Sequence, residues 1–114
     1  MMRFIKKFLW FEFLFFFANL LTVTLFYKNI LLTTAILILI TVVGQIRWKS
    51  FRTLIIFILA GIIGTFGEML AIYAGAWTYN ITNFFNIPIW LFVLWGNAAS
   101  FIYQVAKKFK ERKL

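Results

Sequence analysis

Long apolar runs separated by short polar or basic stretches make up most of this chain. Four such runs cover residues 8–27, 30–46, 53–73 and 87–106. Each is continuously apolar and about 20 residues long, which is the length that an α-helix needs to cross a bilayer. Membrane-spanning strands would instead be runs of about 10 residues with alternating polarity. The pattern therefore predicts an all-α fold, an integral membrane four-helix bundle.

Composition agrees with this prediction and removes several kinds of site. Of the 114 residues, 64% are hydrophobic, whereas about half are apolar in an ordinary soluble domain. A soluble domain of this length could not bury so many large side chains, so we expect one transmembrane domain over residues 1–114. The chain has no cysteine and no histidine, so we expect neither a metal site nor a bound cofactor.

The distribution of basic residues predicts how the helices are oriented. The net charge of +9 would suit nucleic-acid binding if the bases shared one face of a domain. They lie instead at alternate ends of the apolar runs: three before residue 8, three within 47–52 and five after residue 106. The connection at 28–29 holds one basic residue, and the connection at 74–86 holds none. By the positive-inside rule, both termini are cytoplasmic in a multi-pass protein of the plasma membrane, with lipid rather than nucleic acid as its partner.

The stretch 61–97 holds the residues that are most able to form a site. Glu68 lies within an apolar run, where a carboxyl group is costly, and no basic residue is near it in the sequence. We expect it to be neutral at pH 7 and able to donate a hydrogen bond, either to a ligand or simply to neighbouring aromatic and backbone groups. Aromatic side chains are concentrated around it. The predicted ligand-binding residues are Glu68, Trp77, Tyr79, Trp90, Trp95 and Asn97.

Small residues in the third run predict close helix packing. Gly61, Gly64 and Gly67 are the predicted packing residues, because glycines let two helix backbones approach each other in a membrane. Gly64 is expected at about the depth of Asn97, which could then bond across to the third helix. Since Gly44 lies near a helix end, we expect a large residue there to be better tolerated than one at Gly64.

The other carboxyl group within an apolar run, Glu12, is expected about one turn from the cytoplasmic face. It can reach toward Arg47, Arg52 or the lysines beside it in the chain, which favours a role as a structural anchor. Its depth differs from that of Glu68, so the two are not expected to form a catalytic pair of carboxyl groups.

Two motifs resemble those of known membrane proteins. They are G-E-x-x-A-x-Y-x-G-A-W-x-Y over residues 67–79 and I-P-x-W-L-x-x-L-W-G-N-A over residues 87–98. Together they resemble the signature of small polytopic prokaryotic membrane proteins that have no assigned function. They are also distantly similar to a segment of the hydratases and cyclases of carotenoid biosynthesis. That resemblance implies a membrane carboxyl group that acts on a polyprenyl chain beside aromatic residues.

The leading functional hypothesis is a protein that binds or handles an apolar, lipid-like molecule near Glu68 at the external side. One alternative is a small proton-coupled transporter with Glu68 or Glu12 as the proton carrier, similar to four-helix multidrug transporters that have a glutamate in the first helix. Another is an isoprenoid-acting enzyme with Glu68 as general acid. Transport predicts a water-accessible glutamate and a symmetric homo-oligomer, while an enzyme predicts a closed pocket. No catalytic residue is assigned beyond this candidate.

Overall fold

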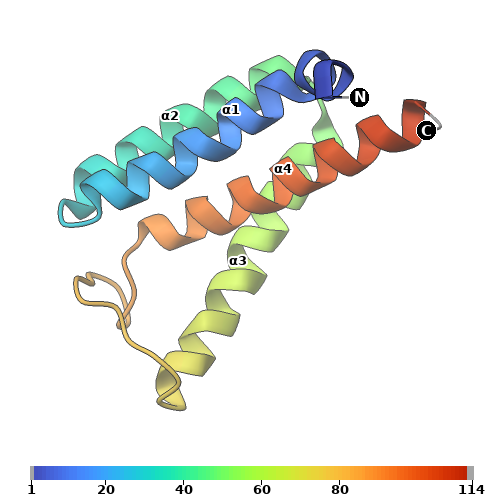
Figure 1. Ribbon diagram of the computed structural model, residues 1–114. Coiled ribbons are helices and arrows are strands. Elements are labelled where there is room, and N and C mark those ends of the chain that lie inside the picture. The colour runs from blue at the N-terminus through green and yellow to red at the C-terminus, as the bar shows by residue number, and fades with distance from the viewer. Residues whose placement is uncertain (1, 113–114) are drawn as a thin grey trace.

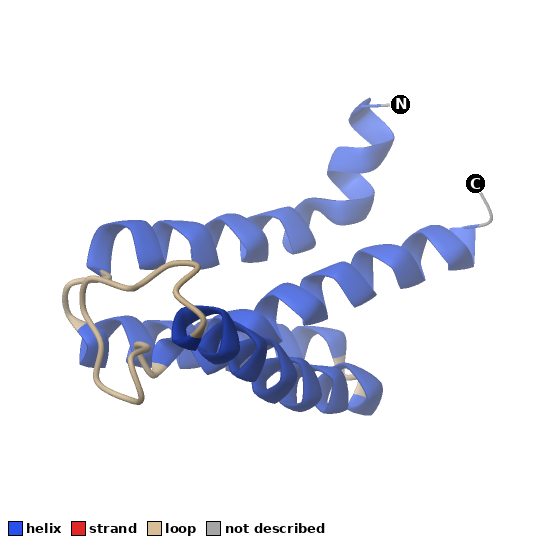
Figure 2. Cartoon of the chain, turned by 90° about the horizontal axis from the view of Figure 1, so that it is seen from below, coloured by secondary structure: helices blue, strands red, loops and turns tan. Residues whose placement is uncertain are grey.

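The chain is all-α, as the sequence predicted. The computed structural model describes the backbone of residues 2–112 and the side chains of residues 8–111. Five of the basic residues used to predict the orientation have side chains outside this part: Arg3, Lys6, Lys7, Arg112 and Lys113. Within residues 2–112 there is no strand (Figure 2). The four helices are α1 (Met2–Phe26), α2 (Ile30–Trp48), α3 (Phe51–Tyr73) and α4 (Trp90–Arg112) (Figure 1).

Two short turns with capping side chains separate the first three helices. The side chain of Asn29 accepts the backbone N–H of Leu32 at 3.0 Å and starts α2. In the same way, Ser50 accepts the N–H of Thr53 at 3.2 Å and starts α3. Asparagine and serine are among the residues that best satisfy free N–H groups at a helix start. Lys49 has a left-handed backbone conformation with φ of 50° and ends α2.

A long loop over residues 74–89 connects α3 to α4. It is held by its own hydrogen bonds, since the backbone N–H of Ile89 donates to the side chain of Asn83 at 2.9 Å and that of Phe84 to the carbonyl of Ile87 at 3.0 Å. The fourth helix begins at Trp90 rather than at Ile87. Pro88 lies just before the helix, where its lack of an N–H group costs nothing.

Three helices are long and apolar enough to cross a membrane: Phe8–Phe26 within α1, together with α2 and α3. The end of α4 is more polar because Lys107, Lys108 and Lys110 follow its apolar part. Many large apolar side chains are exposed, most of all on α3, where Ile63 is 68% and Leu70 is 71% exposed. A surface of this kind is unfavourable in water and favourable in hydrocarbon.

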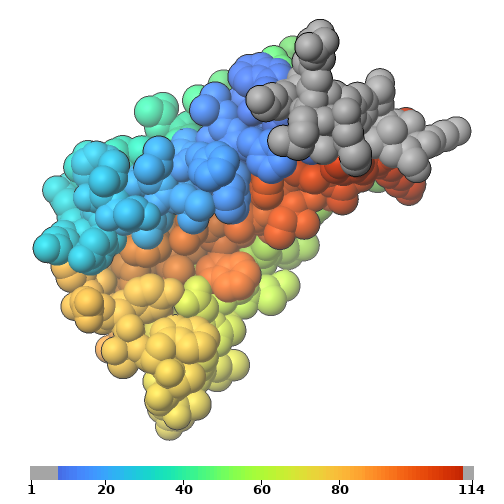
Figure 3. All heavy atoms as spheres, viewed as in Figure 1, coloured from blue at the N-terminus to red at the C-terminus, as the bar shows by residue number. Residues whose placement is uncertain are grey.

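The helices do not all pack around one common core. α1 and α2 form a hairpin, and α4 lies along it, whereas α3 diverges from the hairpin and packs mainly against α4 (Figures 1 and 3). α3 does not pack against α1. The buried cluster of Leu37, Ile87, Trp90 and Leu91 joins α2 to the start of α4 and to the end of the loop. This arrangement leaves hollows on either side of α4.

Candidate ligand-binding cleft

Two aromatic side chains hold the carboxyl group of Glu68. The hydroxyl group of Tyr79, in the loop, donates to Glu68 Oε1 at 2.5 Å, and the indole N–H of Trp95, in α4, donates to Oε2. Both oxygens of the Glu68 carboxyl group therefore act as acceptors. Among residues 8–111 no basic side chain forms an ion pair with Glu68. Its partners are therefore neutral donors.

A cleft of about 400 Å³ opens beside this carboxyl group. It brings together four of the six predicted ligand-binding residues, Glu68, Tyr79, Trp90 and Trp95. Its other walls are aliphatic side chains from α1 and α4, namely Val23, Leu91, Leu94 and Ala98. The cleft is thus an apolar space with one carboxyl group and three aromatic rings at its edge.

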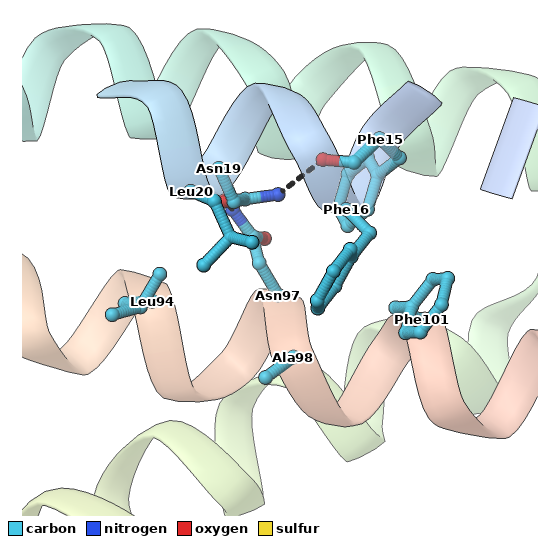
Figure 4. Close-up of a pocket in the computed structure, with 8 residues that line it drawn as sticks. All are labelled: Phe15, Phe16, Asn19, Leu20, Leu94, Asn97, Ala98 and Phe101. Carbon is cyan, nitrogen blue, oxygen red and sulfur yellow. Dashed lines mark hydrogen bonds between the residues drawn. The ribbon is translucent and has the colours of Figure 1, made fainter. Parts of the chain in front are cut away.

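A second hollow of about 170 Å³ lies next to the cleft, between α1 and α4. The two share the lining residues Leu94 and Ala98, so they lie next to each other along α4. Its lining consists of Phe15, Phe16, Asn19, Leu20, Leu94, Asn97, Ala98 and Phe101 (Figure 4). Most of these side chains are apolar, so the pair of hollows could accommodate a long apolar chain whose polar end lies at Glu68.

The structure places the two remaining predicted ligand-binding residues, Trp77 and Asn97, outside the Glu68 cleft, although Asn97 lines the second hollow. The side chain of Trp77 is 48% exposed and lines neither hollow. Asn97 is buried; its side chain donates to Asn19 Oδ1 at 2.8 Å and lies 2.7 Å from the hydroxyl group of Thr41. It therefore joins α4 to α1 and α2. The expected bond from Asn97 to the third helix is wrong, because this face of α4 lies against the α1–α2 hairpin.

Two glycines form the closest contact between α3 and α4. A Cβ on Gly61 would lie 2.8 Å from the carbonyl oxygen of Phe92. A Cβ on Gly96 would lie 2.6 Å from the carbonyl oxygen of Phe57. Any larger side chain at either position would meet the backbone of the other helix, which cannot move aside easily. The sequence indicated Gly61 but not its counterpart in α4.

The other two predicted packing glycines differ from each other. A Cβ on Gly64 would overlap the indole ring of Trp95, whereas one on Gly67 would meet no atom within 4 Å. Gly64 thus provides the space in which Trp95 lies while it donates to Glu68. Gly67 lies outside the helix contact.

Tyr79 connects Glu68 to the wall of the cleft. Burial raises the pKa of the Tyr79 hydroxyl group, and the hydrogen bond and negative charge of Glu68 raise it further. The hydroxyl group therefore keeps its proton to a higher pH than an ordinary tyrosine does. The Tyr79 ring meets that of Trp90 edge to face, with centroids 6.4 Å apart. The Trp90 N–H is buried without a hydrogen-bond partner among residues 8–111, which is rare in folded proteins.

Glu12 has a different environment at the other end of the molecule. Its carboxyl group is 1% exposed, forms an ion pair of 2.9 Å with Lys108, and accepts the indole N–H of Trp48 at 2.9 Å. The prediction that Arg47 or Arg52 pairs with Glu12 is wrong, because the partner is Lys108 of α4. Arg47 instead lies over aromatic rings of α1.

The lining residues that the sequence did not indicate are aliphatic. Val23, Leu91 and Ala98 carry no polar group that would distinguish them from lipid-facing positions. The spacing of Leu91, Leu94 and Ala98, however, places them on the same side of a helix as Trp95. Among the described residues, no group of His, Cys, Asp or Glu side chains could hold a metal ion.

Comparison of the chain with known protein families, with curated proteins and with solved structures finds no match. The function therefore has to be inferred from the cleft and from the surface of the protein.

Proposed function

We propose that the chain is a membrane protein whose four helices span the bilayer, with both termini in the cytoplasm. The apolar length of α1, α2 and α3 and the exposure of their large side chains support the membrane location. The bias of Lys and Arg toward alternate connections supports the orientation. In this orientation the loop 74–89 and the Glu68 cleft belong to the external half.

Within this frame, the Glu68 cleft binds a lipid-like molecule with a long apolar chain and a polar end. The observation that carries this proposal is the position of one carboxyl group at the edge of an otherwise apolar cleft, with a second, mostly apolar hollow beside it. Ligand sites commonly combine apolar walls with a few placed polar groups. Glu68 and Tyr79 would contact the polar end, and Leu94 and Ala98 the chain.

The two motifs of the sequence contribute directly to this cleft. Glu68 and Tyr79 come from the first motif and Trp90 and Trp95 from the second. Their resemblance to a segment of carotenoid-biosynthesis proteins favours a polyprenyl chain as the apolar part. Glu12 is assigned to structure, because its carboxyl group is already paired with Lys108.

Lipidomic mass spectrometry of the purified protein tests the ligand. Ala98→Phe would place a ring between the two hollows without changing charge, and Ala35→Phe adds the same ring to an exposed position of α2. We expect a specific lipid to co-purify with the wild type and with the α2 variant, and to be lost from Ala98→Phe. The same set of lipids in all three proteins would contradict the proposed cleft.

Labelling of single cysteines in intact cells tests the orientation separately. Cysteines in place of Lys28 and Thr82 are expected to react with a membrane-impermeant maleimide, and one in place of Lys110 is expected to react only after lysis. The opposite pattern would move the Glu68 cleft to the cytoplasmic half and leave the proposed ligand chemistry unchanged.

A further inference from the structure

A hollow of about 510 Å³ with charged side chains in its lining lies toward the opposite end of α4 from the Glu68 cleft. Arg52 of α3 lines one side, and the remaining lining residues come from α4: Tyr103, Ala106, Lys107, Lys110 and Glu111. Three basic side chains thus face one acidic side chain, and the hollow has an excess of positive charge.

The local structure explains why these side chains gather. Tyr103, Lys107 and Lys110 follow one another at intervals of four and three residues, so they share one face of α4. The buried side chain of Gln104 donates to the hydroxyl group of Thr53 at 2.6 Å and fixes the start of α3 against this part of α4. The basic groups are therefore mounted on two helices that are joined beside the hollow.

The basic residues of this end of α4 have two different roles. Lys108 points to the other side of the helix and is neutralised by the buried carboxylate of Glu12. Arg52, Lys107 and Lys110 form no ion pair with any of residues 8–111. Topology alone requires only that positive charge lie near this end, not that three cations line one hollow. An unpaired cluster of cations around a hollow is suited to a bound anion.

We propose that this hollow binds the phosphate group of an anionic phospholipid. Arginine and lysine are the side chains that recognise phosphate most readily. Exposed apolar side chains lie next to the lining residues in sequence, including Phe51 beside Arg52 and Ile102 beside Tyr103, which are 74% and 64% exposed. A lipid could therefore place its headgroup in the hollow and its chains on the apolar surface. This site does not depend on the Glu68 cleft.

Native mass spectrometry of the full-length protein in a neutral detergent tests the proposal with short-chain phosphatidylglycerol. Lys107→Gln/Lys110→Gln is compared with Lys28→Gln/Lys49→Gln, which removes the same charge outside the hollow. Each basic residue near an anionic surface contributes about a factor of five, so the loss of two in the first pair should raise the Kd about 25-fold. The second pair should leave the Kd unchanged.

Ala106→Phe provides a test that leaves the charge intact, because its ring would fill the hollow that Ala106 lines. We expect it to weaken phosphatidylglycerol binding while the protein still elutes as the wild type in size-exclusion chromatography. Equal weakening by the two lysine pairs would overturn the proposal, as would equally tight binding of phosphatidylcholine. Inorganic phosphate that binds as tightly as the lipid would overturn the assignment to a lipid headgroup.

Discussion

The two carboxyl groups within the apolar helices have opposite surroundings. Glu12 is buried at the basic end, where Lys108 supplies a full positive charge and Trp48 a hydrogen bond. Glu68 lies at the edge of an open cleft, where Tyr79 and Trp95 are its only donors among residues 8–111. A buried carboxylate with a charged partner has its interactions satisfied within the protein. A carboxyl group with neutral partners beside an open apolar space can still interact with a ligand.

The placement of charge along the chain therefore does not by itself predict whether such a carboxyl group has a charged partner or only neutral ones. Both glutamates follow several apolar residues, and each has an indole N–H as a donor. The two glutamates differ in the residues that α4 places beside them. At Glu12, α4 contributes a lysine, whereas at Glu68 it contributes Trp95 and the apolar wall of the cleft. Matched substitutions at the two positions can therefore test the assignment of roles.

The largest expected effect is the loss of stability in Glu12→Gln. The glutamine can still accept from Trp48, but Lys108 loses its buried counter-charge, which costs about 3 kcal/mol when one partner of such a pair is removed. Glu68→Gln keeps an oxygen that accepts from Trp95 and replaces the oxygen that is hydrogen-bonded to Tyr79. Its loss of stability should therefore stay below about 1 kcal/mol. Unfolding by sodium dodecyl sulfate in mixed micelles measures both free energies.

A double-mutant cycle supplies the control for this comparison. If the ion pair is the cause, the double mutant Glu12→Gln/Lys108→Met should lose much less stability than the sum of the losses in the two single mutants. Additive costs would show that Lys108 does not depend on Glu12. Equal destabilisation by Glu12→Gln and Glu68→Gln would remove the distinction between a structural and a ligand-binding glutamate.

An intermediate effect is expected from glycines near Glu68. Gly64→Ala would push its methyl group into the ring of Trp95 and displace it from Glu68, with an overpacking cost of about 1–3 kcal/mol. Gly67→Ala has the same gain in helix propensity and meets no atom, so it should be neutral or stabilising. Tryptophan fluorescence and the Tm of the two variants measure the difference. Similar values for both would contradict the position of Trp95.

The sequence was sufficient for the class of fold and for part of the site. The length and continuity of the apolar runs predicted all four helices, because each helix satisfies its own backbone hydrogen bonds. The carboxyl group of Glu68 and its aromatic neighbours were also recognisable, since both are unusual within an apolar run. Four of these residues meet in one cleft.

The close packing of the third helix against the fourth was expected and is present, but the faces by which the helices meet could not be predicted, because lipid-facing and helix-facing apolar residues look alike. Asn97 was expected to face α3 and instead bonds to α1 and α2. Gly44 was expected to tolerate a large residue better than Gly64; a Cβ at Gly44 would lie 2.7 Å from the ring of Phe15 and one at Gly64 would lie even closer to the ring of Trp95, so this ranking stays a prediction. The error at Asn97 concerns which face of a helix meets which neighbour, and periodicity within one helix does not contain that information.

The smallest expected effect concerns the proton of Tyr79. Its pKa is raised above the ordinary 10.0, first by burial and then by Glu68. A tyrosine with a raised folded pKa contributes stability that is complete below pH 10 and is lost as the pH rises toward the folded pKa. Ultraviolet titration of the wild type against Tyr79→Phe isolates this phenolate. Glu68→Gln should lower its pKa only in part, because burial is the largest cause. Identical titrations with and without Glu68 would show that the Glu68 charge does not reach Tyr79.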